Sequence, residues 1–196
     1  MTSALLMLDF INDIVHPDGS VAGDGFYREV KKRDVLENAA DALAHARQCK
    51  MPVVHFAFGY SEGFPEWHPA PKLFRQVPER KQVILGTWGT QIHDSVAPMA
   101  GEIVLAKHRI NPFLGTPLAT ILRAKGVDTL YLAGVSTDFV ILSTVLEAHD
   151  RDYQVRVLSD CVASHDQAHH DAALTIINRL ADIQTKQQFT QQDNLS

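Results

Sequence analysis

The sequence predicts an α/β protein of three layers (α/β/α), in which helices cover both faces of a central, mostly parallel sheet. Short apolar runs alternate along the chain with longer segments whose apolar residues recur at helical spacing. This alternation is typical of βαβ units. The length of 196 residues suffices for one substantial core. We therefore expect residues 1–196 to form a single Rossmann-like domain.

The individual elements follow from the period of the apolar residues. Residues 32–49 carry one apolar stripe at i, i+3 and i+4 spacing, which predicts a helix. Thr116 and Pro117 resemble a helix start with a side-chain cap and proline at the first helical position. Strands are expected at 4–9, 53–58, 102–106, 129–133 and 154–158, with a short one near Ile183; further helices are expected at 116–125, from the turn 134–138 to about 152, and at 165–180.

Residues 59–88 interrupt this pattern with many glycines and prolines, which predicts an irregular excursion. Loops of this length are usually functional or disordered. The aromatic residues Tyr60, Phe64 and Trp67 fit a lid that covers a substrate, and they fit a surface loop packed by its own side chains equally well. The sequence leaves both alternatives open.

Composition and charge argue against several classes of partner. The net charge is -5 and the pI is near 6.0, and lysines and arginines form no run long enough for a phosphate-binding stripe. No window approaches the roughly 18 apolar residues of a membrane span, and the first apolar run is too short for a signal sequence. We expect a cytoplasmic protein without nucleic-acid or membrane partners, in which Cys49 and Cys161 are free thiols.

Three chemically interesting features are expected at the carboxyl ends of strands. Asp9 ends the first strand, Lys107 follows the third, and the turn 134–138 follows the fourth. In open parallel sheets the ligand crevice lies just outside these ends, so distant residues meet there. Asp9 alone would read as a carboxylate that caps a turn. Together, the three features predict one active-site pocket.

Four blocks of the sequence resemble the isochorismatase-like, or cysteine hydrolase, family in the same order along nearly the whole chain. Residues 4–13 resemble the opening strand with its catalytic aspartate, although Ile11 stands where a glutamine is common. Residues 86–92 resemble the block before the third strand. Residues 107–113 resemble the lysine motif, with Asn111-Pro112 in place of serine and alanine, and residues 132–144 resemble the nucleophile motif.

The family's nucleophilic cysteine is missing from this chain. Gly134-Val135 and Thr137-Asp138 on one side, and Ser143-Thr144 on the other, fix the register of the motif, so that Val140 occupies the cysteine position. Valine is not a nucleophile. Cys49 and Cys161 lie outside the motif and are not offered as replacements.

The resemblance therefore implies a hydrolase that works without a thiol. In cysteine-bearing members an aspartate takes the thiol proton, a lysine stabilises charge, and backbone N–H groups receive the oxyanion. Isochorismatases proper also lack the cysteine, because they protonate a vinyl ether and add water. We expect Asp9 to act as acid or base and Lys107 to stabilise charge, with vinyl-ether chemistry favoured over cysteine-dependent amide cleavage. Burial raises and a nearby ammonium lowers the pKa of Asp9, and the sequence leaves that balance open.

The expected substrate is a small, anionic metabolite, and the substitution at Val140 leaves an alternative open. A catalytically inactive homologue would bind a small ligand or a protein partner through the same pocket. Arg109 either pairs with a substrate carboxylate or forms a local salt bridge, Trp88 either lines the pocket or packs under the lid, and Phe139 shapes the crevice or a subunit contact. The expected substrate-binding residues are Asn12, Trp88, Arg109, Phe113, Val135, Ser136, Thr137 and Phe139.

We expect neither a cofactor nor a metal. Nicotinamidases of this family carry an Asp-x-His metal motif beside the second strand, whereas here His55 is followed by Phe56. His165, His169 and His170 are spaced like a metal cluster, but the family resemblance favours a structural or capping role. Members of the family commonly assemble, so we expect a homodimer or homotetramer to which the helix after Phe139 contributes.

Overall fold

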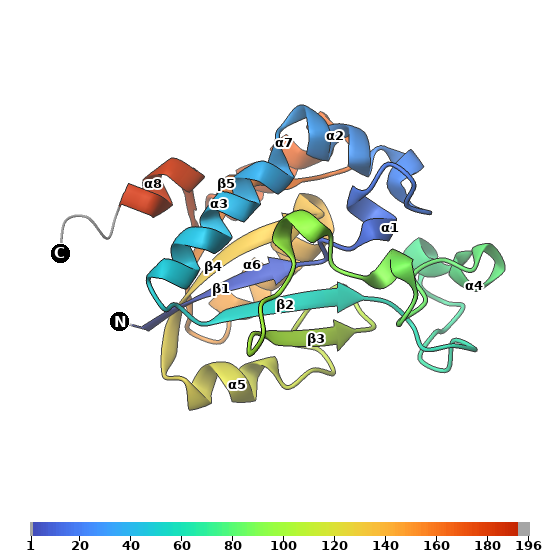
Figure 1. Cartoon of the computed structure of the whole chain (residues 1–196), viewed down its shortest axis with the longest axis horizontal. Helices are drawn as coiled ribbons and strands as arrows, with labels where there is room; N and C mark the ends of the chain where they lie inside the picture. Colours follow the sequence, from blue (N-terminus) through green and yellow to red (C-terminus); the bar gives the residue numbers. More distant parts are fainter. Residues whose placement is uncertain (1, 192–196) are drawn as a thin grey trace.

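A parallel sheet of six strands organises residues 2–191, the part of the chain that this computed structural model describes (Figure 1). The strand order is β3-β2-β1-β4-β5-β6, and every neighbouring pair is parallel. The chain begins in the middle of the sheet, moves out to β3, and then returns to the other side of β1. Such a reversal opens a crevice at the carboxyl ends of the strands. The strands are β1 (Thr2–Leu8), β2 (Val53–Phe58), β3 (Ile103–Lys107), β4 (Val127–Val135), β5 (Gln154–Ala163) and β6 (Asp182–Gln184).

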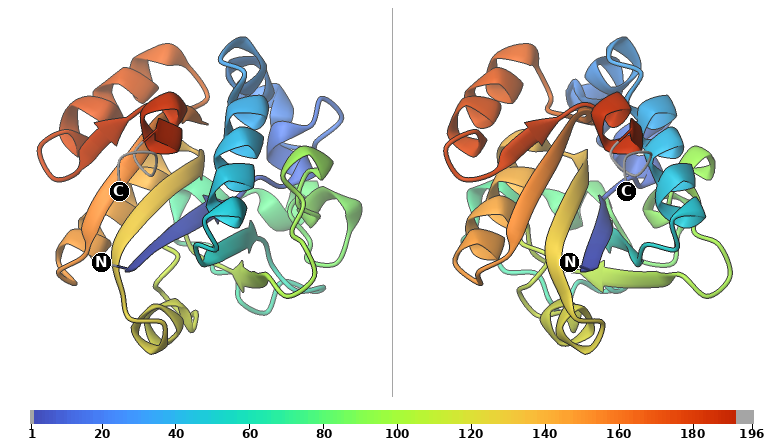
Figure 2. Two further views of the ribbon diagram at one scale, coloured as in Figure 1. Left: turned by 60° about the vertical axis from the view of Figure 1, so that its left-hand side comes forward. Right: turned by 90° about the vertical axis from the view of Figure 1, so that its left-hand side faces the viewer.

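The central strand β1 shows why helices cover both faces of the sheet. Leu5 and Met7 belong to the apolar core on one face, whereas Leu6 and Leu8 belong to the core on the other. Successive side chains of a strand point to opposite faces, so a strand that is apolar throughout needs a layer on each side. Figure 2 shows α3 (Val35–Gln48) on one side and α6 (Leu142–His149) and α7 (Gln167–Ile177) on the other. Within residues 2–191, no helix has the length and apolar character of a membrane span.

The segment 32–49, predicted as one helix, corresponds mainly to α3, which is the second of two consecutive helices. A shorter helix, α2 (Phe26–Lys32), precedes α3. Asp34 between them has a φ of 52°, a left-handed conformation that interrupts a right-handed helix. The helix that carries the stripe therefore begins at Val35, three residues later than predicted.

The second half of the chain follows the predicted order with longer strands. β4 leads into a π-helical turn, η5 (Thr137–Ile141), that continues directly into α6. The hydroxyl of Thr116 accepts a hydrogen bond from the N–H of Leu118 at 3.2 Å at the start of α5 (Leu118–Ala124), and Pro117 occupies the cap position instead of the first helical one. Helix α8 (Lys186–Gln191) lies outside every predicted element.

The excursion after β2 is irregular, as predicted, and is packed largely by its own aromatic side chains. Phe58 and Phe74 stack with ring centroids 4.8 Å apart, and Tyr60 forms an isolated bridge with Ile84. These contacts hold the excursion against the carboxyl ends of the strands. Its short elements are η2 (Lys72–Phe74), α4 (Val77–Arg80), η3 (Trp88–Thr90) and η4 (Asp94–Val96); α1 (Asn12–Val15) and η1 (Ala22–Asp24) follow β1.

Candidate active site

A buried ion pair between Asp9 and Lys107 lies at the carboxyl ends of β1 and β3. Lys107 Nζ is 2.6 Å from Asp9 Oδ2, and each residue is 1% exposed. β2 separates the two strands in the sheet, so the lysine side chain reaches across it, with Nζ 5.1 Å from the centroid of the Phe58 ring. Asp9 has a φ of 58°, which turns the chain away from the strand immediately after Leu8. The tertiary structure thus unites two residues that are almost a hundred positions apart.

Backbone carbonyls fix the position of the Lys107 ammonium. Its Nζ donates hydrogen bonds to the carbonyl oxygens of Arg109 and Ile110, both at 3.0 Å. An ammonium has three donors, and Asp9 accepts the third. Burial lowers the pKa of Lys107, while the Asp9 carboxylate opposes that shift. The lysine is therefore a rigid positive group whose charge is balanced by one carboxylate.

The two oxygens of the Asp9 carboxyl group differ in their contacts. Asp9 Oδ1 is buried and has no hydrogen-bond partner among the described residues. Burial raises the pKa of Asp9 from 3.8 to about 6, although Lys107 and the backbone N–H of Phe58 act in the opposite direction. Desolvation disfavours the charged form of a carboxyl group and explains the direction of this shift. A carboxyl group with such a pKa exchanges protons near neutral pH.

A cavity of about 410 Å³ opens above this pair. Its first wall comes from the strand ends and includes Asp9, Lys107 and Val135, together with Phe139 and Val140 of η5. The second wall comes mainly from residues 72–83 of the excursion. A cavity of this size suits a small molecule.

The second wall brings positive charge to the cavity. Lys72, Arg75 and Arg80 are exposed to solvent and line the cavity. We did not predict these residues from the sequence, although the basic composition of residues 72–81 was a visible signal. Their side chains reach the cavity because η2 and α4 fold back over the strand ends. The basic groups favour an anionic ligand.

Asp13 is a further residue that the sequence reasoning missed. Its carboxylate accepts hydrogen bonds from the backbone N–H groups of Ser20 and Val83, both at 3.0 Å. Val83 lines the cavity, so Asp13 fastens the excursion to the segment after β1. A side chain at Gly89 would collide with this carboxylate.

The structure divides the predicted substrate-binding residues into two groups. Val135, Ser136 and Phe139 line the cavity beside Asp9 and Lys107, as does Val140 at the cysteine position. The remaining predicted residues are absent from the cavity lining: Asn12, Trp88, Arg109, Phe113 and Thr137.

Contacts elsewhere account for the second group. Arg109 donates hydrogen bonds to the carbonyl oxygens of His108 at 2.7 Å and Glu66 at 3.0 Å. The second bond fixes the excursion to the segment after β3. Asn12 donates to the carbonyl of Trp88 at 3.0 Å, and the Trp88 side chain is 46% exposed. Phe113 belongs to the apolar core, and Thr137 Oγ1 lies 2.9 Å from Nδ1 of the buried His170. These residues support the site from outside.

Neither cysteine belongs to the cavity lining. Cys161 is buried in the apolar core of β5, where burial raises the pKa of its thiol, and Cys49 is exposed at the end of α3. Val140 is 8% exposed, and its carbonyl accepts a hydrogen bond from Thr144 Oγ1 at 2.6 Å. Val140, where the sequence motif predicts the nucleophile position, thus carries an unreactive side chain.

The fold and the site together define an α/β protein with a ligand cavity at the carboxyl ends of a parallel sheet and a buried carboxylate and ammonium in its wall. The chain belongs to the isochorismatase family of hydrolases: the family model described as the isochorismatase domain matches residues 3–188. The family and the fold class predicted from the sequence are thereby confirmed.

Named relatives in this family include amidohydrolases. Maleamate amidohydrolase from Pseudomonas putida is 34% identical over 190 residues, which are 96% of this chain and 85% of that protein. Ureidoacrylate amidohydrolase RutB from Methylorubrum extorquens is 35% identical over 172 residues, covering 81% and 68% of the two chains.

Solved structures share the architecture. N-carbamoylsarcosine amidase from Thermoplasma acidophilum has a TM-score of 0.74 at 26% identity, covering 95% of this chain and 97% of that one. A cysteine hydrolase from Pseudomonas syringae pv. phaseolicola has a TM-score of 0.85 at 20% identity, covering 96% and 91%, and shares the fold.

Proposed function

We propose that this protein hydrolyses a small anionic metabolite by acid–base catalysis without a covalent cysteine intermediate. The observation that carries the proposal is the buried pair at the cavity, in which Lys107 Nζ lies 2.6 Å from one oxygen of Asp9 while the other oxygen is without a hydrogen-bond partner in the described chain. Burying two charges is costly, and an unsatisfied polar atom adds to that cost. A substrate that bonds to this oxygen would offset part of it.

Asp9 would transfer the proton, and Lys107 would stabilise the Asp9 carboxylate that the transfer leaves. Burial raises the pKa of Asp9 to about 6, so a protonated fraction exists at neutral pH and the conjugate base is weakly basic. In vinyl-ether hydrolysis the protonated Asp9 would donate its proton to the enol-ether carbon, and water would add to the resulting cation. Asp9 would regain a proton from that water, and the resulting hemiketal would collapse with cleavage of its C–O bond to give a carbonyl compound and an alcohol.

The negative charge of the substrate is inferred from the second wall. Lys72, Arg75 and Arg80 line the cavity, and guanidinium groups bind carboxylates with two parallel hydrogen bonds. The names of two relatives, maleamate amidohydrolase and ureidoacrylate amidohydrolase, also denote small carboxylates as substrates. The proposed substrate is therefore a carboxylate small enough for a cavity of about 410 Å³.

Val140 favours thiol-independent chemistry over the covalent route of cysteine hydrolases. Its side chain lines the cavity, and both cysteines of the chain lie elsewhere. Vinyl-ether hydrolysis needs an acid and water, whereas amide cleavage through an acyl-enzyme needs a nucleophile. We therefore favour the vinyl-ether type, although the relatives named above are amidohydrolases.

A turnover assay tests the proposal. Isochorismate, maleamate, ureidoacrylate, nicotinamide and N-carbamoyl amides would be offered to the unmutated protein and to Asp9→Ala and Val140→Cys variants. Turnover by the unmutated protein that is lost in Asp9→Ala would support acid catalysis without a thiol. Turnover that survives in Asp9→Ala would contradict it.

A second candidate function is ligand binding without turnover, and Val140 is the observation that favours it. In that case the unmutated protein would bind a carboxylate of the panel, as measured by calorimetry, and hydrolyse none. Amide hydrolysis that appears only in Val140→Cys would identify a cysteine-hydrolase scaffold that has lost its nucleophile. These outcomes differ from every result that acid catalysis predicts.

We also propose that the chain assembles with copies of itself as a dimer or tetramer. Phe139 of η5 and Leu146 of α6 are 40% and 47% exposed, and exposed apolar side chains on adjoining elements suit a subunit contact. Light scattering coupled to size-exclusion chromatography measures the mass directly. A mass of one chain, about 21.8 kDa, would contradict this proposal.

A further inference from the structure

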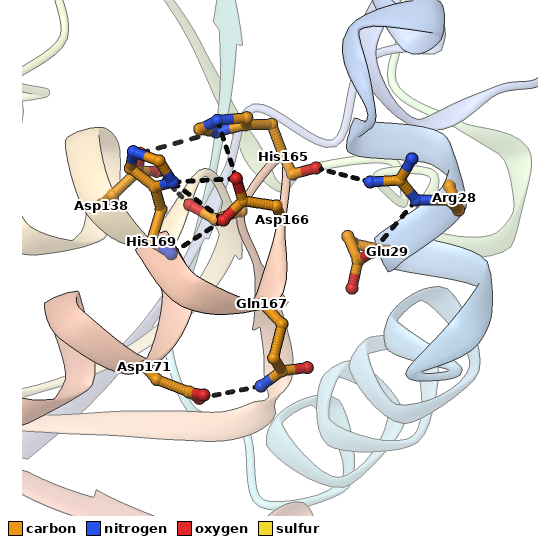
Figure 3. Close-up of polar contacts among 9 residues, drawn as sticks. Arg28, Glu29, Asp138, His165, Asp166, Gln167, His169 and Asp171 are labelled. Atoms are coloured by element: carbon orange, nitrogen blue, oxygen red, sulfur yellow. Dashed lines mark hydrogen bonds and ion pairs between the residues drawn. The ribbon is translucent and has the colours of Figure 1, made fainter.

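Two histidines and two aspartates, none of which lines the cavity, gather where α7 begins beside η5 (Figure 3). His169 Nδ1 lies 2.8 Å and 3.0 Å from the two carboxylate oxygens of Asp166. His165 Nε2 lies 3.3 Å from Asp166 Oδ2. On the other side of the His165 ring, Nδ1 lies 3.9 Å from Asp138 Oδ2, an oxygen that is buried and accepts no hydrogen bond within residues 2–191.

We propose that His165, Asp166 and His169 form a binding site for a zinc ion. Imidazole nitrogens and carboxylate oxygens are both zinc ligands, and two imidazoles favour zinc over the oxygen-preferring magnesium and calcium. One ligand atom from each of the three residues lies within 4.8 Å of the others.

The spacing of the ligand atoms suits a tetrahedral ion. Zinc binds nitrogen and oxygen at roughly 2.0–2.2 Å, which places neighbouring ligands about 3.3–3.6 Å apart. The distances of 2.8–3.3 Å from Asp166 to the two rings are close to this value.

Neighbouring residues hold the ligands in place before any ion binds. Arg28 Nη2 donates to the carbonyl oxygen of His165 at 3.2 Å, while its Nε pairs with Glu29 at 3.1 Å, so a carboxylate balances its charge. Asp166 is the N-cap of α7 and accepts from the N–H of His169 at 2.8 Å. A fixed backbone lowers the entropic cost of gathering the ligands.

The third histidine of the predicted cluster is not part of this site. His170 is buried, with Nδ1 2.9 Å from Thr137 Oγ1 and Nε2 2.7 Å from Arg33 Nη2. Its role is structural, which fits the sequence-based interpretation. For His165 and His169, we propose zinc binding in place of the structural or capping role expected from the sequence. The proposal also replaces the expectation that the protein binds no metal.

A bound zinc ion would brace the cavity without taking part in the reaction. The ion would join the segment after β5 to the first turn of α7, and His165 lies 3.9 Å from Asp138, which precedes Phe139 and Val140 of the cavity lining. The His165 ring also packs against Phe26, another lining residue, with centroids 6.0 Å apart. Because its ligands are absent from the cavity lining, the site is structural and not catalytic.

Isothermal titration calorimetry with zinc chloride tests this site, in a Cys49→Ser background. That background is needed because Cys49 Sγ lies 3.6 Å from His45 Nε2, and a thiol beside an imidazole would compete for the added zinc. We expect one zinc ion per chain, no comparable binding of calcium, and a higher Tm with zinc, since an ion that binds only the folded state stabilises it. His165→Gln and His169→Gln should each weaken zinc binding at least tenfold.

Two further variants make the test specific. His149→Gln is the matched control. His149 lies on α6, its side chain is 53% exposed, and its Nδ1 lies 3.1 Å from a carboxylate oxygen of Asp150. The His149→Gln variant should bind zinc as the parent does. Asp166→Asn keeps an oxygen to cap α7 and should weaken zinc binding. The proposal is wrong if the parent binds no zinc, or if the His165 and His169 variants bind it as tightly as the His149 control. Neither readout depends on turnover, so the result is independent of the proposed hydrolase activity.

Discussion

The two walls of the cavity differ in how they are held. On the strand-end wall, Asp9 and Lys107 are each 1% exposed, and the lysine is fixed by the carboxylate and two backbone carbonyls. On the excursion wall, Lys72, Arg75 and Arg80 are exposed. Asp13 anchors this wall from behind through the N–H of Val83.

Under the proposed function, this difference would separate chemistry from recognition. A proton-transfer group has to be positioned within a few tenths of an ångström, and burial tunes its pKa. Long basic side chains on a loop select a ligand by charge and can change without disturbing the core. We therefore expect changes on the strand-end wall to alter kcat, and changes on the excursion wall to alter KM.

The largest effect is expected from Asp9→Asn. An amide neither donates a proton to a carbon nor regains one from water, so kcat should fall about 10²–10⁴-fold, as is usual for the loss of an acid–base group. The measurement is steady-state turnover of the substrate identified in the panel. Asp24→Asn is the control, because Asp24 is an exposed carboxylate that lines the same cavity. An equal fall in kcat in both variants would show that Asp9 has no catalytic role beyond that of any carboxylate in the cavity lining.

The pH dependence should follow the state of Asp9. With a pKa of about 6, the acid form is lost as the pH rises, so kcat/KM should fall about tenfold per pH unit above that value. A rise through pH 6 would instead identify Asp9 as a base. The raised pKa also affects stability: between pH 3.8 and about 6 the folded protein retains a proton that the unfolded chain has released, so the free energy of unfolding should decrease with pH. Asp9→Asn should lack this contribution.

A smaller effect is expected from Arg75→Gln and Arg80→Gln. Each removes one charge-assisted contact with an anionic substrate, so KM should rise about tenfold while kcat stays within about twofold. Arg123→Gln changes an exposed arginine on α5, away from the cavity lining, and should leave both constants unchanged. A fall in kcat at constant KM would place these arginines in the catalytic machinery.

The smallest effect is expected from Gly89→Ala, which disturbs the anchor of the excursion. The added methyl group meets the Asp13 carboxylate, so the free energy of unfolding should drop by about 1 kcal/mol, with a few-fold rise in KM. At Gly23 an added Cβ meets nothing within 4 Å, so Gly23→Ala controls for the loss of glycine in the unfolded chain. Chemical denaturation of both variants measures the difference. Equal stability would show that Asp13 has room to move aside.

Residues tied to strand ends were predictable from the sequence, and residues on loops were not. Asp9, Lys107 and the turn 134–138 follow apolar runs, and the carboxyl ends of parallel strands meet at one edge. The turn was recognisable from Gly134 after the fourth apolar run, and in the structure a side chain there would collide with the carbonyl of Leu8. Arg109 was predicted beside the substrate, but it lies two residues past β3, where the chain has left the sheet and the guanidinium binds the carbonyl of Glu66.

The sequence by itself determined the parallel sheet, the family, and the positions of Asp9 and Lys107 at the ends of strands. Apolar periodicity and local motifs encode these features, and both are readable along the chain. Only the tertiary structure decided that Arg75 and Arg80 reach the cavity, that Asp13 holds Val83, and that His165 and His169 share one carboxylate while His170 turns inwards. These arrangements depend on how irregular segments and helix starts pack against distant elements, and no local period records that packing.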